Sequence, residues 1–421
     1  MYRKEETRNG VRVVCHPMSE KQSIAVGIWI NTGSRNENPR IAGISHFLEH
    51  MVFKGTANYS CTKIKESIEG VGGSFNGFTS EEMTCYLVKI PASYWKLAVD
   101  ILADMAARPR LNVRDINKER TVILEEIKMY KDLPQSYVHE LLDDLLWPGH
   151  QLGASVLGTE KSVSSLGRRE LSAYKQGQYT ASNMVLAAAG RLDFGALTGA
   201  AEKIFSSVAR GRQNSVVPAG KQKGAARKVC LLQKETEQAH LAMGFHALRR
   251  DHPLKYAQNL LNIILGANSS SRLFNEIREK RGLAYEIGSQ VKRLKDTGAF
   301  VIHAGVDNRK LEPTVKLVLA ELAKITSKPV PESELKRAKE FYTGQLMISL
   351  EDTLDHMFWI GESTLALDKT FSLDEVIRSI NAVSAADILA VARGIFREGA
   401  ARLAVIGPVK GREKKIQELL A

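Results

Sequence analysis

The sequence predicts an α+β fold made of two α/β domains of the same kind, each with a sheet on one side and helices on the other. A length of 421 residues is more than one hydrophobic core usually fills. In addition, the strands and helices expected in the first half recur in the same order in the second half, offset by roughly 215 residues. We therefore divide the chain into an N-terminal domain (1–209), a linker (210–228) and a C-terminal domain (229–421).

Segments rich in β-branched residues predict the strands of the first half, and apolar residues at helical spacing predict its helices. The strands are expected at residues 11–15, 23–30, 74–79, 83–90 and 183–189. The helices are expected at residues 41–53, 61–71, 94–107, 112–131, 134–146, 168–178 and 194–208. Ser60 is expected to cap the helix that follows it, and residues 162–166 are expected to form a turn.

The second half repeats this plan with weaker sequence similarity. Residues 238–245 correspond to the second strand, 271–277 to the second helix, and 285–292 and 298–305 to the strand pair. Residues 311–325 correspond to the third helix and 401–407 to the last strand. Residues 260–266 (LLNIILG) take the place of helix 41–53 and contain neither His nor Glu. We therefore expect only the first half to bind a metal.

The composition is that of an ordinary globular protein, with 44% apolar and 25% charged residues. No run approaches about 18 apolar residues, so we expect no membrane span. The first residues contain no apolar signal segment, and the four cysteines are scattered and lack C-x-x-C spacing. We interpret the cysteines as reduced thiols, which predicts a cytoplasmic location.

A net charge of +12 raises the question of a nucleic-acid partner. The basic residues are spread along the chain, and their densest group, 210–228, contains Gly, Pro, Ser and Ala but no aromatic residue that could stack on bases. We interpret this group as a solvated linker and expect no nucleic-acid binding.

A motif for metal chemistry lies in residues 43–56 (GISHFLEHMVFKGT). On a helix, His46 and His50 are four residues apart and share one face, about 6 Å from each other. Glu49 shares this face, and its carboxylate is suited to act as the general base beside a zinc ion held by the two imidazoles. The order H-x-x-E-H is the inverse of the commoner H-E-x-x-H zinc motif.

A catalytic zinc ion usually has three protein ligands, so one more is needed. Glu119 and Glu126 are seven residues apart and lie on nearly the same face of helix 112–131. Because Ile123 and Ile127 flank Glu126, its side chain is expected against the buried stripe, and we assign it as the third ligand. Glu119 is expected to orient a ligand or the metal-bound water. The remaining histidines are expected to be surface or core residues: His16, His139, His150, His240, His246, His252, His303 and His356.

With these residues, the chain resembles the inverzincin family of zinc peptidases (M16), which contains pitrilysin, insulin-degrading enzyme and the mitochondrial processing peptidase. Its length is similar to that of the short bacterial processing-peptidase-like members. The matching segments are residues 43–56, the pair Glu119 and Glu126, residues 73–86 and residues 273–285. The resemblance covers nearly the whole chain and implies two homologous domains, each a mostly antiparallel sheet covered by helices.

The resemblance also implies how substrate is bound. Asn76 is expected on an edge strand that pairs with an extended peptide, and this chain has Gly77 where the family usually has Ala. Arg278 and Tyr285 match a pair that the C-terminal domain supplies to hold the substrate carbonyl and stabilise the oxyanion. Judging by the family, four such domains enclose a chamber, so we expect a homodimer, with a heterodimer with a metal-free paralogue as the alternative.

The sequence thus predicts a zinc endopeptidase with one Zn²⁺ per chain that cleaves peptides or unfolded polypeptide segments. Glu49 would take a proton from the attacking water and deliver it to the leaving amine. The alternative is a non-catalytic core or scaffold subunit of a processing-peptidase-like assembly, which would not require His46, Glu49, His50 and Glu126 to be present together.

Overall fold

The computed structural model describes residues 2–220 and 227–420, and the chain folds into two compact units. Unit 1 contains Met1–Ile127, Ser155–Val217 and Met347–Leu373, and unit 2 contains Lys128–Ala154, Pro218–Leu346 and Asp374–Ala421. Lys128–Ala154, from the first half of the chain, therefore belongs to unit 2, and Met347–Leu373, from the second half, belongs to unit 1. Residues 221–226 of the predicted linker lie outside the described residues. As folding domains, the boundaries 1–209 and 229–421 stay a prediction.

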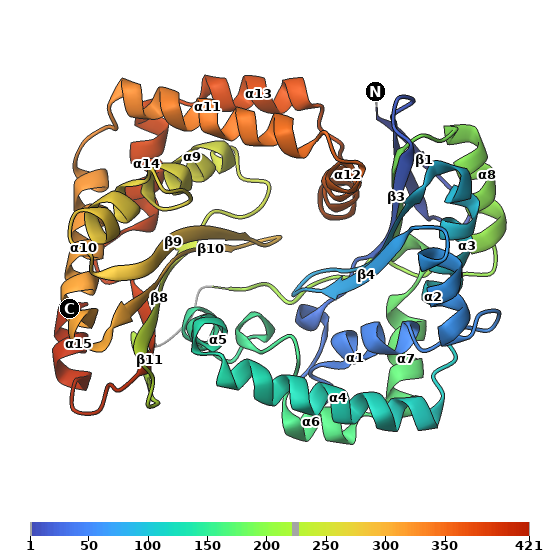
Figure 1. Cartoon of the computed structure of the whole chain (residues 1–421), viewed down its shortest axis with the longest axis horizontal. Helices are drawn as coiled ribbons and strands as arrows, with labels where there is room; N and C mark the ends of the chain where they lie inside the picture. The colour runs from blue at the N-terminus through green and yellow to red at the C-terminus, as the bar shows by residue number, and fades with distance from the viewer. Residues whose placement is uncertain (1, 221–226, 421) are drawn as a thin grey trace. The chain divides into compact units, whose positions relative to one another are not determined.

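Unit 1 is organised around a six-stranded sheet (Figure 1). Its strands, in spatial order, are β1 (Arg3–Glu6), β2 (Arg12–Pro17), β6 (Met184–Gly190), β3 (Ser23–Ile30), β5 (Thr84–Pro91) and β4 (Ser74–Thr79). The β2–β6 pair is parallel and the other pairs are antiparallel. Because β4 pairs only with β5, β4 is an edge strand, as the sequence analysis expects for Asn76.

Helices cover both faces of this sheet. The helices of unit 1 are α1 (Ile44–Val52), α2 (Cys61–Glu69), α3 (Trp95–Ala107), most of α4 (Val113–Asp132), α6 (Glu160–Ser165), α7 (Arg168–Gln178), α8 (Phe194–Phe205) and α12 (Thr353–Leu367). One face packs against α1, α3 and α8, and the opposite face packs Trp29 and its neighbours against Met357 and Ile360 of α12. Burial on both faces explains why β3 is an almost continuous apolar run.

Unit 2 is organised around a five-stranded sheet of the same topology. Its strands, in spatial order, are β7 (Val229–Gln233), β11 (Arg402–Gly407), β8 (Gln238–Ala247), β10 (Gly298–Asp307) and β9 (Ala284–Arg293). Its helices are α5 (Pro134–Leu146), α9 (Lys255–Leu265), a π-helical segment (Phe274–Glu279), α10 (Leu311–Ser327), most of α11 (Glu332–Ser349) and α13 (Leu373–Ala382), α14 (Ala385–Ile395) and α15 (Glu413–Leu419).

The two sheets confirm the predicted duplication. With β1 set aside, the strand orders β2-β6-β3-β5-β4 and β7-β11-β8-β10-β9 correspond one to one, including the single parallel pair in each sheet. Helices α5 and α12 occupy corresponding places in the two halves of the chain. Helix α5, from the first half, packs on the sheet of unit 2, whereas α12, from the second half, packs on the sheet of unit 1 (Figure 1). The α+β fold class with two homologous domains is therefore correct.

Three local expectations need correction. Residues 162–166 are not a plain turn, because Glu160–Ser165 form α6, which Thr159 caps through the Ser162 amide. Helix α1 begins at Ile44 and not at residue 41, because Gly43 adopts a left-handed conformation with φ +88°. Strands β1 and β7 are absent from the predicted elements; β1 is exposed along its whole length and therefore has no apolar pattern to reveal it.

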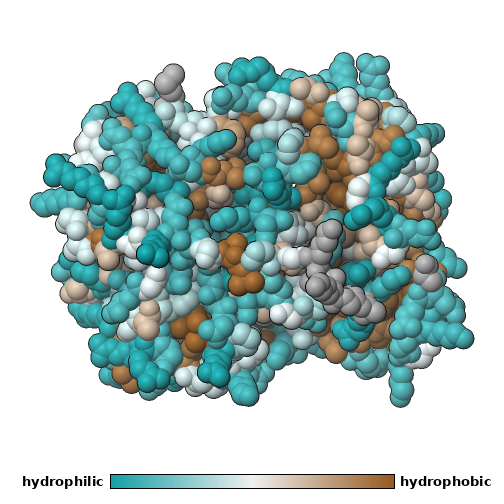
Figure 2. Space-filling model, turned by 180° about the vertical axis from the view of Figure 1, so that it is seen from behind, coloured by the Kyte–Doolittle hydropathy of each residue, from teal (hydrophilic) through white to brown (hydrophobic). Residues whose placement is uncertain are grey.

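On the face shown in Figure 2, apolar residues occur in separate groups between polar ones. Within the described part of the chain, no helix is long and apolar enough to cross a membrane.

Candidate metal centre

Helix α1 is held at its N-terminus by a buried carboxylate. Glu37 accepts hydrogen bonds from the backbone amides of Gly43 (2.7 Å) and Ser45 (2.8 Å). A carboxylate in this place interacts favourably with the positive end of the helix dipole. A Cβ at Gly43 would lie 2.4 Å from the Leu157 carbonyl oxygen, so only glycine fits this approach. Burial raises the pKa of Glu37 to about 7 despite these hydrogen bonds. The first residues of the motif therefore fix where the histidine helix starts.

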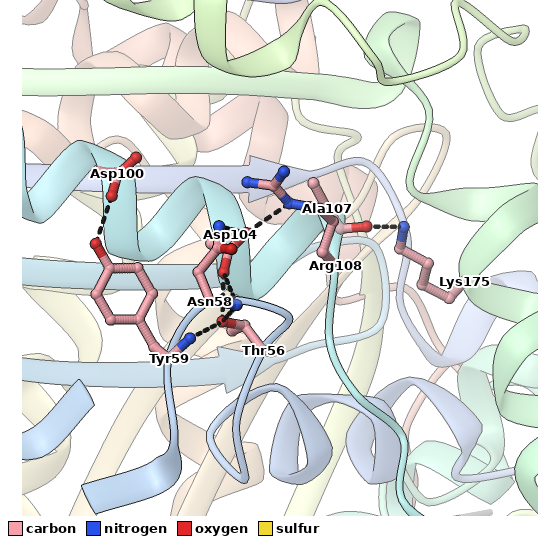
Figure 3. A network of polar contacts seen from close by, with 8 residues as sticks. All are labelled: Thr56, Asn58, Tyr59, Asp100, Asp104, Ala107, Arg108 and Lys175. Atoms are coloured by element: carbon pink, nitrogen blue, oxygen red, sulfur yellow. Dashed lines mark hydrogen bonds and ion pairs between the residues drawn. The ribbon is translucent and has the colours of Figure 1, made fainter. Parts of the chain in front are cut away.

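The turn after α1 is fixed by a polar network (Figure 3). The buried Asp104 of α3 accepts hydrogen bonds from the Thr56 hydroxyl, the Asn58 amide (3.2 Å) and Arg108 Nε (2.6 Å). Nearby, the Tyr59 hydroxyl donates to Asp100 at 2.5 Å. Gly55, with φ +123°, allows the chain to reverse here. Gly55 and Thr56 of the motif thus anchor α1 to α3 and hold no metal themselves.

Three donor groups from two helices converge beside the sheet. His46 and His50 of α1 and Glu126 of α4 form the one group of three or more His, Cys, Asp or Glu residues among the described residues whose ligand atoms all lie within 4.8 Å of one another. Glu126 Oε2 is 3.7 Å from His46 Nε2 and 3.5 Å from His50 Nε2. The buried Ile123 and Ile127 anchor α4 so that Glu126 faces the histidines, whereas Glu125 is exposed.

Glu119 contacts His50 on the side of the ring away from the converging atoms. Its Oε2 is 3.2 Å from His50 Nδ1, and its Oε1 is 2.7 Å from the Lys54 ammonium. With Nδ1–H donated to Glu119, loss of the Nε2 proton of His50 gives the tautomer whose Nε2 lone pair a metal would need. Within the described residues, His46 Nδ1 is buried without a hydrogen-bond partner, so the two imidazoles are supported unequally.

Glu49 is held by the edge strand. The hydroxyl of Thr79, the last residue of β4, donates to Glu49 Oε2 at 2.6 Å. Burial raises the pKa of Glu49, while the Thr79 hydrogen bond and the nearby His50 oppose this shift. A carboxylate with a raised pKa, oriented by one oxygen, has the properties of a general base.

The histidines and Glu126 influence one another electrostatically. Burial, followed by the neighbouring His50, lowers the pKa of His46. For His50, hydrogen bonds to Glu126 and Glu119 outweigh burial, so its pKa is raised. The same hydrogen bond from His50 lowers the pKa of Glu126. A divalent cation would favour the neutral imidazoles and the ionised carboxylate.

The donor set fits zinc. Two imidazoles and one carboxylate are common zinc ligands, and ligands about 2.0–2.2 Å from a tetrahedral ion stand about 3.3–3.6 Å apart. The observed separations of 3.5 and 3.7 Å are close to this range. Three protein donors leave one position of a tetrahedral ion for water or substrate, which is typical of catalytic sites.

Asn76 and Gly77 lie in the middle of the edge strand β4. Asn76 is exposed, and its Oδ1 accepts a hydrogen bond from the Gly77 amide at 2.8 Å. A Cβ at Gly77 would lie 3.0 Å from the Phe53 ring and 3.3 Å from Tyr86. The glycine therefore lets Phe53, which follows the histidine helix, pack closely against β4.

Arg278 and Tyr285 lie together in unit 2. The Arg278 guanidinium stands over the Phe274 ring at 4.8 Å and over the Tyr285 ring at 5.4 Å. Arg278 belongs to the π-helical segment, a distortion often found at functional sites. The Tyr285 side chain is 75% exposed, so it is available for binding and does not pack in the core. Because these residues belong to the other unit, their action on the metal site is a proposal.

The sequence analysis overlooked three residues that position the site: Glu37, Lys54 and Thr79. Each contacts a residue of α1 or its partners through tertiary structure. Lys54 lies inside the matching motif, and Thr79 is three residues after Asn76, so both positions could have been noticed. For Glu37, no local pattern points to its role.

Paired imidazoles and carboxylates on helices beside a sheet edge define a metal-dependent hydrolase type of site. Residues 12–160 match the family described as Insulinase (Peptidase family M16), and residues 165–342 match Peptidase M16 inactive domain. The chain is 38% identical to the uncharacterized zinc protease YmxG of Bacillus subtilis, over 97% of this chain and 98% of that protein. An uncharacterized zinc protease of Streptomyces coelicolor is 34% identical over 96% of this chain and 89% of its own length. The chain therefore belongs to peptidase family M16.

Solved structures show the same fold. The crystal structure of a protease from Helicobacter pylori has a TM-score of 0.90 at 21% identity and covers 97% of this chain and 99% of its own. A peptidase M16 inactive domain from Pseudomonas fluorescens has a TM-score of 0.89 at 20% identity, covering 97% of this chain and 98% of its own. At these identities, the similarity concerns the fold alone.

Proposed function

We propose that the protein is a zinc-dependent endopeptidase that hydrolyses peptides or unfolded polypeptide segments. The convergence of His46, His50 and Glu126 within 4.8 Å, next to the half-buried Glu49, is the observation that supports this proposal most directly. Relatives that match nearly the whole chain are named zinc proteases, which supports the same reaction class.

In this proposal, His46, His50 and Glu126 hold the zinc ion. When bound, zinc supplies a Lewis acid that polarises the scissile carbonyl and makes water more acidic. Glu49 accepts the proton of the attacking water on its carboxylate and then transfers it to the nitrogen of the leaving amine. Because Thr79 donates to Oε2, the other oxygen, Oε1, is left to exchange the proton.

Substrate binding would use the edge strand and the second unit. The backbone groups of β4 around Asn76 and Gly77 can pair with an extended peptide whatever its side chains. Arg278 and Tyr285 would together hold the substrate carbonyl and stabilise the oxyanion. This assignment follows the family resemblance and the exposure of Tyr285.

We further propose that the chain assembles as a homodimer around an enclosed chamber. One chain contains both the metal-binding residues and the Arg278–Tyr285 pair, so two identical chains would be self-sufficient. A heterodimer with a metal-free paralogue is the alternative. An enclosed chamber would restrict substrates to peptides and unfolded segments.

The decisive experiment compares the Glu49→Gln variant with the wild type. The variant should bind as much zinc as the wild type, because Glu49 is not a ligand, and should cleave a peptide library about 10²–10⁴-fold more slowly. Metal analysis and cleavage rates measure the two properties. Glu66→Gln, which changes an exposed glutamate of α2, is the matched control. Zinc-loaded Glu49→Gln protein with wild-type turnover would refute the mechanism, and a wild type that cleaves no peptide would favour a scaffold role.

A further inference from the structure

A second group of histidines lies in unit 2, where the first turns of α5 cross the sheet. His240 of β8, His303 of β10, Glu286 of β9 and His139 of α5 line one cavity of about 210 Å³. The sequence analysis expected these histidines to be ordinary surface or core residues. Their gathering around one cavity calls for a different explanation.

The strand register explains why the three sheet residues share one face. In the paired strands, His240 stands opposite Gly305, and Gly305 stands opposite Glu286. His303 is two residues before Gly305, so its side chain leaves the same face. Gly305 has no side chain, so the Gln238 amide oxygen and the His240 ring approach the centre of this row; a Cβ at Gly305 would lie 3.0 Å from Gln238 Oε1 and 3.6 Å from the His240 ring. On the next row, a Cβ at Gly288 would lie 3.0 Å from the His303 ring, so glycine lets this ring lie close to β9.

Helix α5 closes the site from above the sheet. Its residues Val138 and Leu142 pack on the apolar part of the same sheet face, beside Ala242 and Val301. This packing directs His139 toward the sheet, and its ring lies 5.6 Å from the His303 ring, centroid to centroid. The cavity therefore has donor groups from three strands and one helix.

One pair of donors approaches the spacing of a metal site, but among the described residues no three of the four have ligand atoms that all lie within 4.8 Å of one another. His303 Nε2 is 4.0 Å from Glu286 Oε1, whereas ligands of one tetrahedral zinc ion stand about 3.3–3.6 Å apart. The Glu286 side chain is 68% exposed and can turn inward. In contrast to the site at His46, a metal here would have to draw its ligands together, so binding should be weaker.

The charge state of the histidines suits a metal better than an anion. Burial lowers the pKa values of His240 and His303, and burial together with the neighbouring His303 and Lys292 lowers the pKa of His139 to about 4. The imidazoles are therefore neutral near pH 7, the form that binds a metal. Among the described atoms, His303 Nδ1 is buried without a hydrogen-bond partner. Packing alone does not explain why polar rings are gathered here.

We propose that His139, His240, His303 and Glu286 form a second divalent-metal site that takes a late first-row cation such as Zn²⁺. Imidazole donors favour this class of ion over Mg²⁺ or Ca²⁺. Four protein ligands leave a tetrahedral ion without an open position, so the site is structural. The metal would join α5 to three strands of the sheet that it covers and would stabilise unit 2. This proposal does not depend on peptidase activity.

The test measures metal stoichiometry and stability of the full-length protein. Metal-stripped wild type titrated with Co²⁺ should bind two ions per chain, the second more weakly, with visible bands of tetrahedral coordination. The His46→Ala/His50→Ala variant should keep the weaker site, and adding His303→Ala to it should abolish binding. Zn²⁺ should raise the melting temperature of His46→Ala/His50→Ala protein but not that of the triple variant.

Two further variants keep the test decisive. Glu286→Gln alters an exposed side chain and should fold normally, yet weaken the second site about tenfold or more. His252→Ala, a histidine of unit 2 outside the cavity, is the matched control and should leave both sites intact. A wild type that binds one ion only, or a second ion that persists at equal affinity in both Glu286→Gln and the His303→Ala variant, would overturn the proposal.

Discussion

Helices α1 and α9 occupy corresponding places in the two halves of the chain, and only α1 has metal-binding residues. In α9, the buried positions are nearly all apolar and include Leu260, Leu261 and Ile264. Helix α1 keeps a core face with Phe47 and Leu48 but turns His46 and His50 toward Glu126 of α4. The same topology therefore accepts a helix whose inward face is almost entirely apolar as well as one that also directs metal-binding residues at its neighbours. The polar face requires partners on α4 and β4, which supply Glu119, Glu126 and Thr79.

Of the changes that test the difference between α1 and α9, removal of Glu126 should have the largest effect on zinc binding and cleavage. Glu126→Ala leaves two imidazoles, so zinc binding at this site should weaken by more than the roughly 10–100-fold that loss of an outer hydrogen-bond partner costs, and peptide cleavage should be lost. Zinc titration of the metal-stripped protein measures the effect. The neighbouring Glu125→Ala, an exposed position, should behave like the wild type. Equal zinc affinities for the two variants would remove Glu126 from the ligand set.

Much of the fold could be predicted because the periodic signals are local. Residues 23–30, 74–79 and 168–178 match β3, β4 and α7 residue for residue. The places of α5 and α12 could not be predicted, because both sheets present a second apolar face and sequence order does not tell which sheet a helix will cover. The exchange of these helices depends on tertiary packing alone.

The candidate site shows the same limit. The spacing of His46 and His50 and the helical phase of Glu126 are local properties, and the structure brings their donor atoms together. Lys54 and Thr79 lie in segments that match the family, but spacing could not identify their partners, because each meets its carboxylate across the fold. The cavity around His303 was missed for the same reason, since its residues are far apart in the chain and meet through strand register.

The second-largest effect is expected where unit 2 contributes to catalysis. Arg278→Ala should lower kcat about 10²–10³-fold without loss of zinc, because a group that stabilises the oxyanion acts in the transition state and not on the metal. Steady-state kinetics and metal analysis measure the two outcomes. Lys280→Ala removes an exposed cation two residues away and is the control. Unchanged kinetics in Arg278→Ala would remove Arg278 from the proposed catalytic residues.

A smaller effect is expected from the outer partner of His50. Glu119→Gln weakens the acceptor for His50 Nδ1–H and should lower zinc affinity about 10–100-fold while the fold stays intact. Lys54→Met should also lower zinc affinity, but by a smaller factor, because Lys54 acts through Glu119. Competition with a chelating dye gives the affinities, with Lys118→Gln as the exposed control. Wild-type affinity in Glu119→Gln would show that His50 needs no such support.

The smallest effect concerns the attachment of α12 to the sheet of unit 1. The His356 ring of α12 lies 4.4 Å from the His16 ring of β2, and burial, followed by His16, lowers the pKa of His356 to about 4. The folded state thus binds fewer protons than the unfolded state, whose histidine has a pKa near 6.5. Stability is therefore fully present above about pH 6.5 and falls by on the order of 2 kcal/mol as the pH drops toward 4.

Hydrogen–deuterium exchange of α12 peptides at pH 7 and pH 5 can measure this loss. The ion pairs Lys89–Asp352 and Lys4–Asp368 also attach α12, but their carboxylates have lowered pKa values and stay charged in this range. His356→Leu should therefore make exchange of α12 less dependent on pH, while α5, which holds His139 against His303, should keep its own acid sensitivity. If α12 in His356→Leu loosens at pH 5 as much as in the wild type, the histidine pair does not control its attachment.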